Sequence, residues 1–260
     1  MRKTAGPRPR SGETLDTFHR GRVRLFQKKA GYRFSVDAPL LADFIRTRTS
    51  DDILEVGTGS GIIALLLGRR PFRHITALEV QPGLASLARR NIALNGLENR
   101  IGVVRADYRK YGPGRKFDLV FSNPPYIPRA GGFLSRVTER SVARHELRGG
   151  IADLMGKTAG WLKPGGRACF VFPERRREDF MAAAAAAGLR VRRSRPVKAR
   201  AGEPPNLFLA EVGFAGRGER TGSGRRKGRG GSAKEPTALV LFKKDGSYTS
   251  DAEAIFSGRR

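Results

Sequence analysis

The sequence Asn123-Pro124-Pro125-Tyr126 closes an apolar stretch, and its residue types could act on an amine nitrogen. An exocyclic amine such as adenine N6 is a weak nucleophile, because its lone pair is delocalised into the ring. Two acceptors aimed at its hydrogens, the Asn123 side-chain oxygen and the Pro124 carbonyl, favour a tetrahedral nitrogen with an exposed lone pair. The two prolines fix that carbonyl in advance, and Tyr126 offers a ring on which an extruded base can stack.

A nitrogen held in this way can attack a methyl carbon in line, and holding both partners supplies much of the rate without a metal or a strong base. A Pro-rich loop with an Asx turn is the alternative reading. That reading does not explain why four specified residues fall at the end of an expected strand, so the catalytic interpretation is favoured.

A second motif, a glycine-rich turn, separates an expected strand at 53–56 from an expected helix at 62–70. Taken alone, a turn of this kind is common in α/β proteins and could be no more than a tight turn of small residues. Its residues are Glu55, Val56, Gly57, Thr58, Gly59, Ser60 and Gly61.

Carboxylates at successive strand ends narrow the choice of cofactor. Glu79 ends the next apolar run, where a carboxylate can take both hydroxyls of a ribose, and Asp107 ends the run after it. A carboxylate inside the turn, Glu55, would repel the diphosphate of a dinucleotide, which needs a free helix N-terminus. It suits a cofactor that has no phosphate and carries a positive sulfonium, as S-adenosylmethionine does.

Short β-rich runs alternate with helical stretches around these motifs, which predicts an α/β fold with a largely parallel, doubly wound sheet. In such a sheet, ligands bind beyond the carboxyl ends of the strands near the switch point. The chemistry is therefore expected at the ends of the first four strands. Expected strands cover 53–56, 75–78, 101–105, 117–121, 167–172, 189–197, 206–214 and 238–242. Expected helices cover 37–48, 62–70, 83–94, a stretch ending at Trp161, 174–187 and 250–256.

Composition divides the chain into four parts. Residues 1–14 are expected to be a disordered basic arm and 216–236 a flexible Gly/Arg-rich linker, because neither can bury a core. Residues 15–215 form the expected catalytic domain, and 237–260 a strand and helix packed on it. The arm and the linker could track RNA phosphates, or they could be idle solvated segments; both readings are open.

The net charge of the 260-residue chain is +27 and its pI is about 11.5, which points to a polyanionic partner such as nucleic acid or an anionic membrane surface. A host whose whole proteome is rich in arginine is the alternative. Charge and motif together favour nucleic acid. The oligomeric state is not indicated.

Other features exclude several classes of protein. The sequence has no apolar run of the roughly 18 residues that would cross a membrane and no signal peptide. The single cysteine, Cys169, lies in an apolar run and fits a reducing cytoplasm. His19, His74 and His145 lack the spacing of metal ligands, so no metal site is expected.

The glycine-rich turn resembles the first motif of class I S-adenosylmethionine-dependent methyltransferases, which implies their Rossmann-like, seven-stranded, mostly parallel sheet. By this resemblance Glu55 orders the turn and the methionine amine region, Glu79 binds the ribose, and Asp107 accepts from the adenine amine. Gly57, Gly59 and Gly61 would allow close backbone approach. The resemblance also implies cofactor contacts at Asp37, Thr58, Val80 and Asn123. The segment that contains Asp37 could instead be only a capped amphipathic helix.

Asn123-Pro124-Pro125-Tyr126 resembles the fourth motif of amino-methyltransferases, which act on adenine N6 in DNA or RNA, guanine N2 in RNA, or a glutamine amide in release factors. Three further segments resemble bacterial tRNA adenine-N6-methyltransferases that modify the adenine 3′ of the anticodon in a valine tRNA; they are 22–37, 143–146 and 243–249. The similarity covers roughly 14–215 and 237–256, and the Gly/Arg insertion and basic arm depart from that family. Only about fifty residues precede the first expected strand, which disfavours a release-factor methyltransferase with its longer N-terminal substrate domain. A catalytically inactive RNA-binding scaffold is disfavoured because both motifs are intact.

Overall fold

The computed structural model describes residues 7–30, 33–124, 150–215 and 237–259 of the chain. Four features predicted from the sequence therefore lie wholly or partly outside the described residues: Pro125 with Tyr126, Glu146 in the segment 143–146, the start of the basic arm, and the segment 216–236.

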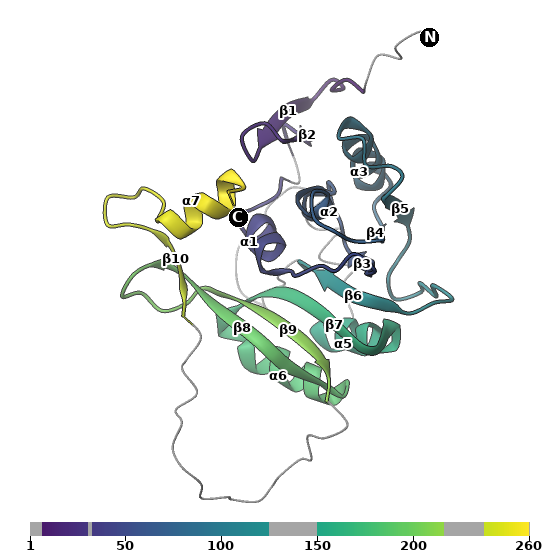
Figure 1. The fold of residues 1–260 in the computed structure, drawn as a ribbon, viewed down its shortest axis with the longest axis vertical. Coiled ribbons are helices and arrows are strands. Elements are labelled where there is room, and N and C mark those ends of the chain that lie inside the picture. Colours follow the sequence, from purple (N-terminus) through teal and green to yellow (C-terminus); the bar gives the residue numbers. More distant parts are fainter. Residues whose placement is uncertain (1–6, 31–32, 125–149, 216–236, 260) are drawn as a thin grey trace, which may run out of the picture.

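The described residues form an eight-stranded sheet with the order β10-β8-β9-β7-β6-β3-β4-β5 and a separate two-stranded sheet of β1 and β2 (Figure 1). The strands are β1 (Glu13–Phe18), β2 (Val23–Lys28), β3 (Asp52–Val56), β4 (His74–Glu79), β5 (Ile101–Arg105), β6 (Phe117–Ser122), β7 (Leu162–Pro173), β8 (Leu189–Arg200), β9 (Leu207–Phe214) and β10 (Leu239–Phe242). The predicted α/β fold class is confirmed. The main sheet has one strand more than the seven that the family resemblance implies. The additional strand is β10, expected from the sequence at 238–242, which pairs in parallel with β8 and extends that edge.

The order of strands produces a switch point between β3 and β6. From β3 the chain adds β4 and then β5 on one side, and it returns to add β6 and then β7 on the other. All of these strands are parallel, whereas β9 runs antiparallel to both β7 and β8. The carboxyl ends of β3 and β6 are thus adjacent, with Val56 paired with Ser122, and a ligand site is expected beyond them.

Helices cover both faces of the sheet, which explains why every residue of β3 is buried. One core joins α1, α2 and α7 to the sheet, and the other joins α5 and α6 to its opposite face (Figure 1). The helices are α1 (Asp37–Phe44), α2 (Ile62–Leu67), α3 (Pro82–Leu94), α5 (Gly150–Trp161), α6 (Arg177–Ala186) and α7 (Ser250–Ser257), with a 3-10 turn η1 (Glu174–Arg176). In the described residues, no helix combines the length and the apolar character that crossing a membrane requires.

The hairpin of β1 and β2 was not predicted from the sequence. It begins at Glu13, so the last two residues of the expected disordered arm belong to a strand. An ion pair between Glu13 and Arg90 of α3, at 2.6 Å, fixes the hairpin on the helix. Arg90 also lies over the ring of Phe26, with its guanidinium carbon 4.7 Å from the ring centroid. The hairpin therefore docks on the domain through both charge and aromatic contacts.

Candidate functional site

The glycine-rich turn connects β3 to α2 and adopts a conformation that only glycine tolerates well at three positions. Gly57, Gly59 and Gly61 have φ values of 76°, 58° and 86°. The backbone N–H groups of Gly57 and Thr58 both donate to the Leu78 carbonyl, at 3.0 and 2.9 Å. A Cβ atom at Gly57 would meet nothing within 4 Å, so the turn borders open space at the carboxyl end of the sheet.

Glu79, at the end of β4, is held against this turn. Its side chain is buried, and one carboxylate oxygen accepts from the Gly59 N–H at 2.8 Å. The other oxygen accepts from the Gln81 N–H at 2.9 Å. The structure thus brings together Glu79 and the glycine turn, as the motif analysis predicted, and a carboxylate is a group that accepts from a ligand hydroxyl. Val80, the next residue, is half-buried.

Glu55 is the most perturbed acid of the turn region. It is almost fully buried, and the Thr58 hydroxyl donates to its carboxyl at 2.6 Å. Burial raises the pKa of Glu55 to about 8, and the negative charge of Glu79 adds to that effect. The carboxyl is therefore mostly protonated at neutral pH, and a cation placed beside it would favour the ionised form.

The residues after β6 lie next to the residues after β3. The Ser122 hydroxyl donates to the Val56 carbonyl at 2.8 Å, and both residues are buried. Asn123 follows immediately and is half-buried, and Pro124 is buried. The structure therefore brings Asn123 and Pro124 to the same edge as the glycine turn. Pro125 and Tyr126 fall outside the described residues.

Asp107 lies two residues beyond β5, and the structure gives it a partner that the sequence analysis did not name. The Arg109 guanidinium donates to both oxygens of the carboxylate, with its Nη2 at 2.5 Å, and the Arg109 backbone N–H donates at 2.9 Å. These hydrogen bonds lower the pKa of Asp107. Arg109 therefore occupies both oxygens of the carboxylate to which the family resemblance assigns the adenine amine.

Asp37 is the first residue of α1 and is half-buried. The helix it opens packs on α2, which follows the glycine turn. The helix ends at Phe44 rather than at the expected 48, and Ile45 already has extended backbone.

Asn91 of α3 is a site-positioning residue that the sequence analysis missed. It is fully buried, and its side-chain oxygen accepts from the Phe26 N–H at 2.6 Å. Its amide nitrogen donates to the Phe26 carbonyl at 3.1 Å and to the Ser60 carbonyl at 2.9 Å. One side chain thus joins β2, α3 and the glycine turn. The signal available in the sequence was a polar residue on the apolar face that Leu84, Leu87 and Ala88 define.

The aromatic residues of the segment 22–37 have structural roles where they are described. Phe26 is fully buried beneath Arg90. Phe34 packs on Phe18 with ring centroids 5.4 Å apart. Tyr32 lies outside the described residues. Within the described ranges, no group of three or more His, Cys, Asp or Glu side chains could hold a metal ion.

Solved structures share this fold. A predicted O-methyltransferase from Agrobacterium tumefaciens superposes with a TM-score of 0.58 at 19% identity, over 86% of this chain and 96% of that one. The tRNA m1G37 methyltransferase of M. jannaschii has a TM-score of 0.56 at 17% identity, over 78% of this chain and 55% of that one. The sheet and the glycine turn thus have the class I methyltransferase architecture.

The chain belongs to the methyltransferase small domain family, whose model matches residues 33–174. It is therefore a methyltransferase of the class that uses S-adenosylmethionine. Two curated relatives carry the name tRNA1(Val) (adenine(37)-N6)-methyltransferase. The relative from a Flavobacteriaceae bacterium is 36% identical over 56% of this chain and 62% of its own length. The relative from Tolumonas auensis is 31% identical over 75% of this chain and 80% of its own length.

Proposed function

We propose that this enzyme transfers a methyl group from S-adenosylmethionine to the N6 amine of an adenine in tRNA, beside the anticodon. The names of the relatives from a Flavobacteriaceae bacterium and Tolumonas auensis support the substrate. The main structural support for this reaction is the hydrogen bond between Ser122 and Val56. Because these two residues directly precede Asn123 and Gly57, Asn123 and the glycine turn lie at one edge of the sheet.

The residues at the turn fit the cofactor. The open space beside Gly57 admits a group against the backbone, and Glu79 offers carboxylate lone pairs beside Gly59, where a ribose would bind. Glu55 is close to the turn and neutral in the protein alone. A cationic amine beside Glu55 would draw off its proton and be held by the resulting carboxylate. Thr58 fixes the carboxyl orientation, and Asp37 and Val80 complete the proposed cofactor contacts.

S-adenosylmethionine, when bound, supplies an electrophilic methyl group on a sulfonium. Asn123 accepts a hydrogen bond from one N–H of the substrate amine through its side-chain oxygen, and the Pro124 carbonyl accepts a hydrogen bond from the other N–H. The amine is thereby held with its lone pair directed across the edge between β6 and β3. Preorganised acceptors of this kind cost no reorganisation during the reaction, so they stabilise the developing positive charge on nitrogen. Once methylated, the nitrogen loses one of its two protons to solvent. Pro125 is proposed to fix the Pro124 carbonyl, and Tyr126 to stack on the adenine.

Transfer of a tritiated methyl group tests the substrate class. The purified enzyme is incubated with labelled cofactor and, separately, unmodified tRNA, ribosomal RNA, DNA and release factor. Transfer to tRNA is expected, with the label recovered as N6-methyladenosine on nucleoside analysis. Exclusive labelling of DNA, ribosomal RNA guanine or a release-factor glutamine would overturn the proposed substrate and leave the methyltransferase class intact.

A further inference from the structure

A polar cavity of about 400 Å³ lies away from the methyl-transfer site, between the C-terminal end of α1 and β8. We call it the α1–β8 cavity. Its lining residues are Asp43, Phe44, Arg46, Arg193, Ser194, Arg195 and Thr237. Three strand-to-strand steps separate β8 from β6, whose end carries Asn123, which at about 4.8 Å per step amounts to roughly 14 Å. The cavity is therefore too distant to hold the reacting nucleotide.

A β-bulge places the arginines of β8 in this cavity. Val191 pairs with Val212 and Arg193 with Glu211, so Arg192 is an extra residue without a partner position in the ladder. Val191 packs in the core on the α6 side of the sheet, whereas Val197, further along β8, packs in the core on the α1 side. The bulge thus shifts by one residue the alternation of side chains between the two faces of the sheet, and it directs Arg193 and Arg195 toward α1. Bulges that re-aim a side chain recur near functional sites.

Arg193 forms a fixed wall of the α1–β8 cavity. Its guanidinium carbon lies 3.7 Å from the centroid of the Phe44 ring, and its Nη2 donates to the Phe44 carbonyl at 2.7 Å and to Glu211 at 2.9 Å. These contacts leave Arg193 little freedom and partly neutralise its charge.

Arg46 and Arg195 are better placed to bind a ligand. Arg46 is exposed, and its guanidinium forms no ion pair with any residue in the described part of the chain. Arg195 is 24% exposed and lies 3.6 Å from Asp251, which is 58% exposed. An ion pair at this distance with an exposed carboxylate is weak. Thr237 adds a hydroxyl to the lining, and Asp43 is its one carboxylate. The cavity thus contains two guanidinium groups that can reorient toward a ligand, those of Arg46 and Arg195, and a third, that of Arg193, which is held in place.

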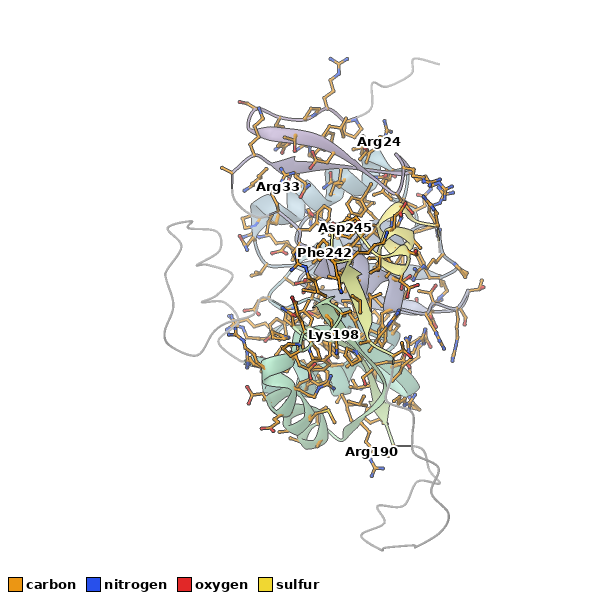
Figure 2. All side chains as sticks on the ribbon, turned by 90° about the vertical axis from the view of Figure 1, so that its left-hand side faces the viewer. Arg24, Arg33, Arg190, Lys198, Phe242 and Asp245 are labelled. Carbon is orange, nitrogen blue, oxygen red and sulfur yellow. The ribbon has the colours of Figure 1, made fainter. Side chains whose placement is uncertain are left out.

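The strand that lines the cavity carries further basic residues on both of its faces. Arg190, Arg192, Lys198 and Arg200 lie on the same strand, and among the described residues only Arg200 has an acidic partner, Glu203 at 3.8 Å. Figure 2 shows Lys198 midway along this side of the molecule and Arg190 at its lower end, below Arg24 and Arg33 of the hairpin region. β10 pairs only with residues 197–200 of β8, so the stretch that lines the cavity is not covered by β10.

We propose that the α1–β8 cavity binds a backbone phosphate of the RNA substrate, at a point remote from the methylated base. This inference rests on the proposed function. Guanidinium groups match phosphate oxygens in a bidentate geometry, and a cavity of this size admits a sugar-phosphate unit rather than an ion alone. The contact supplies affinity and fixes the orientation of the RNA on the enzyme without reading its sequence.

The double variant Arg46→Ala/Arg195→Ala tests the proposal. Arg46 is exposed, whereas the Arg195 side chain is only 24% exposed, so urea denaturation first establishes that the double variant is folded. Arg193 is left in place because it packs on Phe44. Binding of a full-length tRNA transcript is measured by fluorescence anisotropy across a salt series. We expect the dissociation constant to rise on the order of tenfold, as loss of charged hydrogen bonds predicts. The slope of log K against log salt should flatten by about 1 to 2, because fewer counterions are released.

The matched control is Arg69→Ala/Arg89→Ala, which removes the same charge from exposed positions after α2 and on α3. The control should change tRNA affinity much less. In methylation assays the loss in the test variant should fall on KM for full-length tRNA, and KM for an isolated anticodon stem-loop should change less. Equal effects of the two double variants, or an unchanged salt slope in Arg46→Ala/Arg195→Ala, would overturn the proposal.

A free nucleotide offers the same phosphate chemistry, so inorganic phosphate and ATP are titrated against wild-type enzyme and both double variants. Saturable ATP or phosphate binding that requires Arg46 and Arg195, with tRNA affinity unaffected, would assign the cavity to a small ligand and reject the RNA contact. Wild-type methyl transfer to tRNA is measured in parallel. Its absence would reject the proposed function, whereas its presence with normal tRNA binding by the test variant would reject only this inference.

Discussion

The Ser122 hydroxyl donates to the Val56 carbonyl at 2.8 Å, and this hydrogen bond joins the last residues of β6 and β3. Ser122 directly precedes Asn123, and Val56 directly precedes Gly57. The distance between the substrate acceptors and the cofactor turn therefore depends on the pairing of two buried strand ends and not on the loops that follow them. Rigid elements of this kind can hold two reactants in line.

Ser122→Ala is expected to lower kcat several-fold. The variant leaves the Val56 carbonyl with one partner fewer, and a buried hydrogen bond of this type contributes about 1 kcal/mol to stability. The position of Asn123 relative to the glycine turn becomes less fixed, so the catalytic loss should exceed the loss of stability. Single-turnover methylation and urea denaturation measure the two effects.

Thr158→Val is the matched control for that experiment, because its buried hydroxyl has no hydrogen-bond partner in the described structure. Replacing this hydroxyl by a methyl group should leave the free energy of unfolding unchanged or raise it. If Ser122→Ala behaves in the same way in both assays, the junction has no role in catalysis.

The stability of the enzyme should depend on pH through Glu55. The pKa of this carboxyl is about 8 in the folded protein, above its ordinary value of 4.5. Between pH 4.5 and about 8, Glu55 keeps a proton in the folded state that it has lost in the unfolded chain. The stabilisation that comes from this difference is complete below pH 4.5 and is lost as pH rises toward 8. The glutamine of Glu55→Gln cannot ionise. The unfolding free energy of wild type minus that of the variant should therefore decrease as pH rises through this window. Urea titrations from pH 5 upward measure it, and a constant difference would show that Glu55 is ionised throughout.

Cofactor binding should release the same proton. A cationic amine beside Glu55 favours the carboxylate, so binding near pH 7 should expel close to one proton in wild type and fewer in Glu55→Gln. Calorimetry in buffers of different ionisation enthalpy counts the protons. Equal proton release by the two proteins would place the cation elsewhere.

Asn91→Ala is expected to destabilise the fold and weaken cofactor binding together. Three buried backbone groups, the N–H and carbonyl of Phe26 and the carbonyl of Ser60, lose a partner, and each such loss costs about 1–3 kcal/mol. Cofactor affinity, measured well below the melting temperature, tests for a positioning role. Asn91→Asp keeps the acceptor for Phe26 but turns a carboxylate toward two carbonyls, so it should not rescue binding. Normal cofactor affinity in folded Asn91→Ala would leave Asn91 a purely structural residue.

The parts of the fold that sequence reasoning predicted are those whose signal is local. β3, β4 and β6 are buried on both faces and appear as continuous apolar runs. The hairpin was missed because its stability comes from distant partners on α3. Its turn contains His19 and Arg20 at positive φ, 49° and 56°, rather than the Asn-Gly pair that marks tight hairpins in sequence.

In the candidate site, too, features with a local signal could be predicted from the sequence, whereas features that depend on distant partners could not. The positions of Asn123 and Glu79 could be predicted because strand order places both at the edge beyond the carboxyl ends of β3, β4 and β6. Two other features could not be predicted: the pairing of Asp107 with Arg109 and the burial of Glu55. Both depend on side-chain rotamers and on neighbours from other strands. The role of Asn91 could not be predicted for a related reason, because a helical pattern alone does not show to which carbonyls a polar side chain donates hydrogen bonds.

Arg109→Ala should tighten cofactor binding. The Arg109 guanidinium holds both oxygens of Asp107 and lowers its pKa, so it competes with the adenine amine for the same acceptors. Its side chain is partly exposed, and a pair of this kind contributes at most about 1 kcal/mol, so the gain in affinity should be up to about fivefold. Asp107→Ala should weaken binding in the same assay. Weaker binding in Arg109→Ala would mean that Arg109 itself contacts the cofactor.

Asn123→Ala should nearly abolish methyl transfer and change cofactor affinity far less, although the family resemblance also implies a cofactor contact at Asn123. The side-chain oxygen is proposed to accept a hydrogen of the substrate amine, and removing one preorganised partner of a reacting group typically costs on the order of 10² to 10³ in kcat. Asn123→Asp retains an acceptor oxygen at the same place and should therefore keep more activity than the alanine variant. Cofactor affinity is measured by calorimetry and kcat with saturating tRNA. An unchanged kcat in Asn123→Ala would reject the acceptor mechanism, because the Pro124 carbonyl alone would then suffice to present the nitrogen.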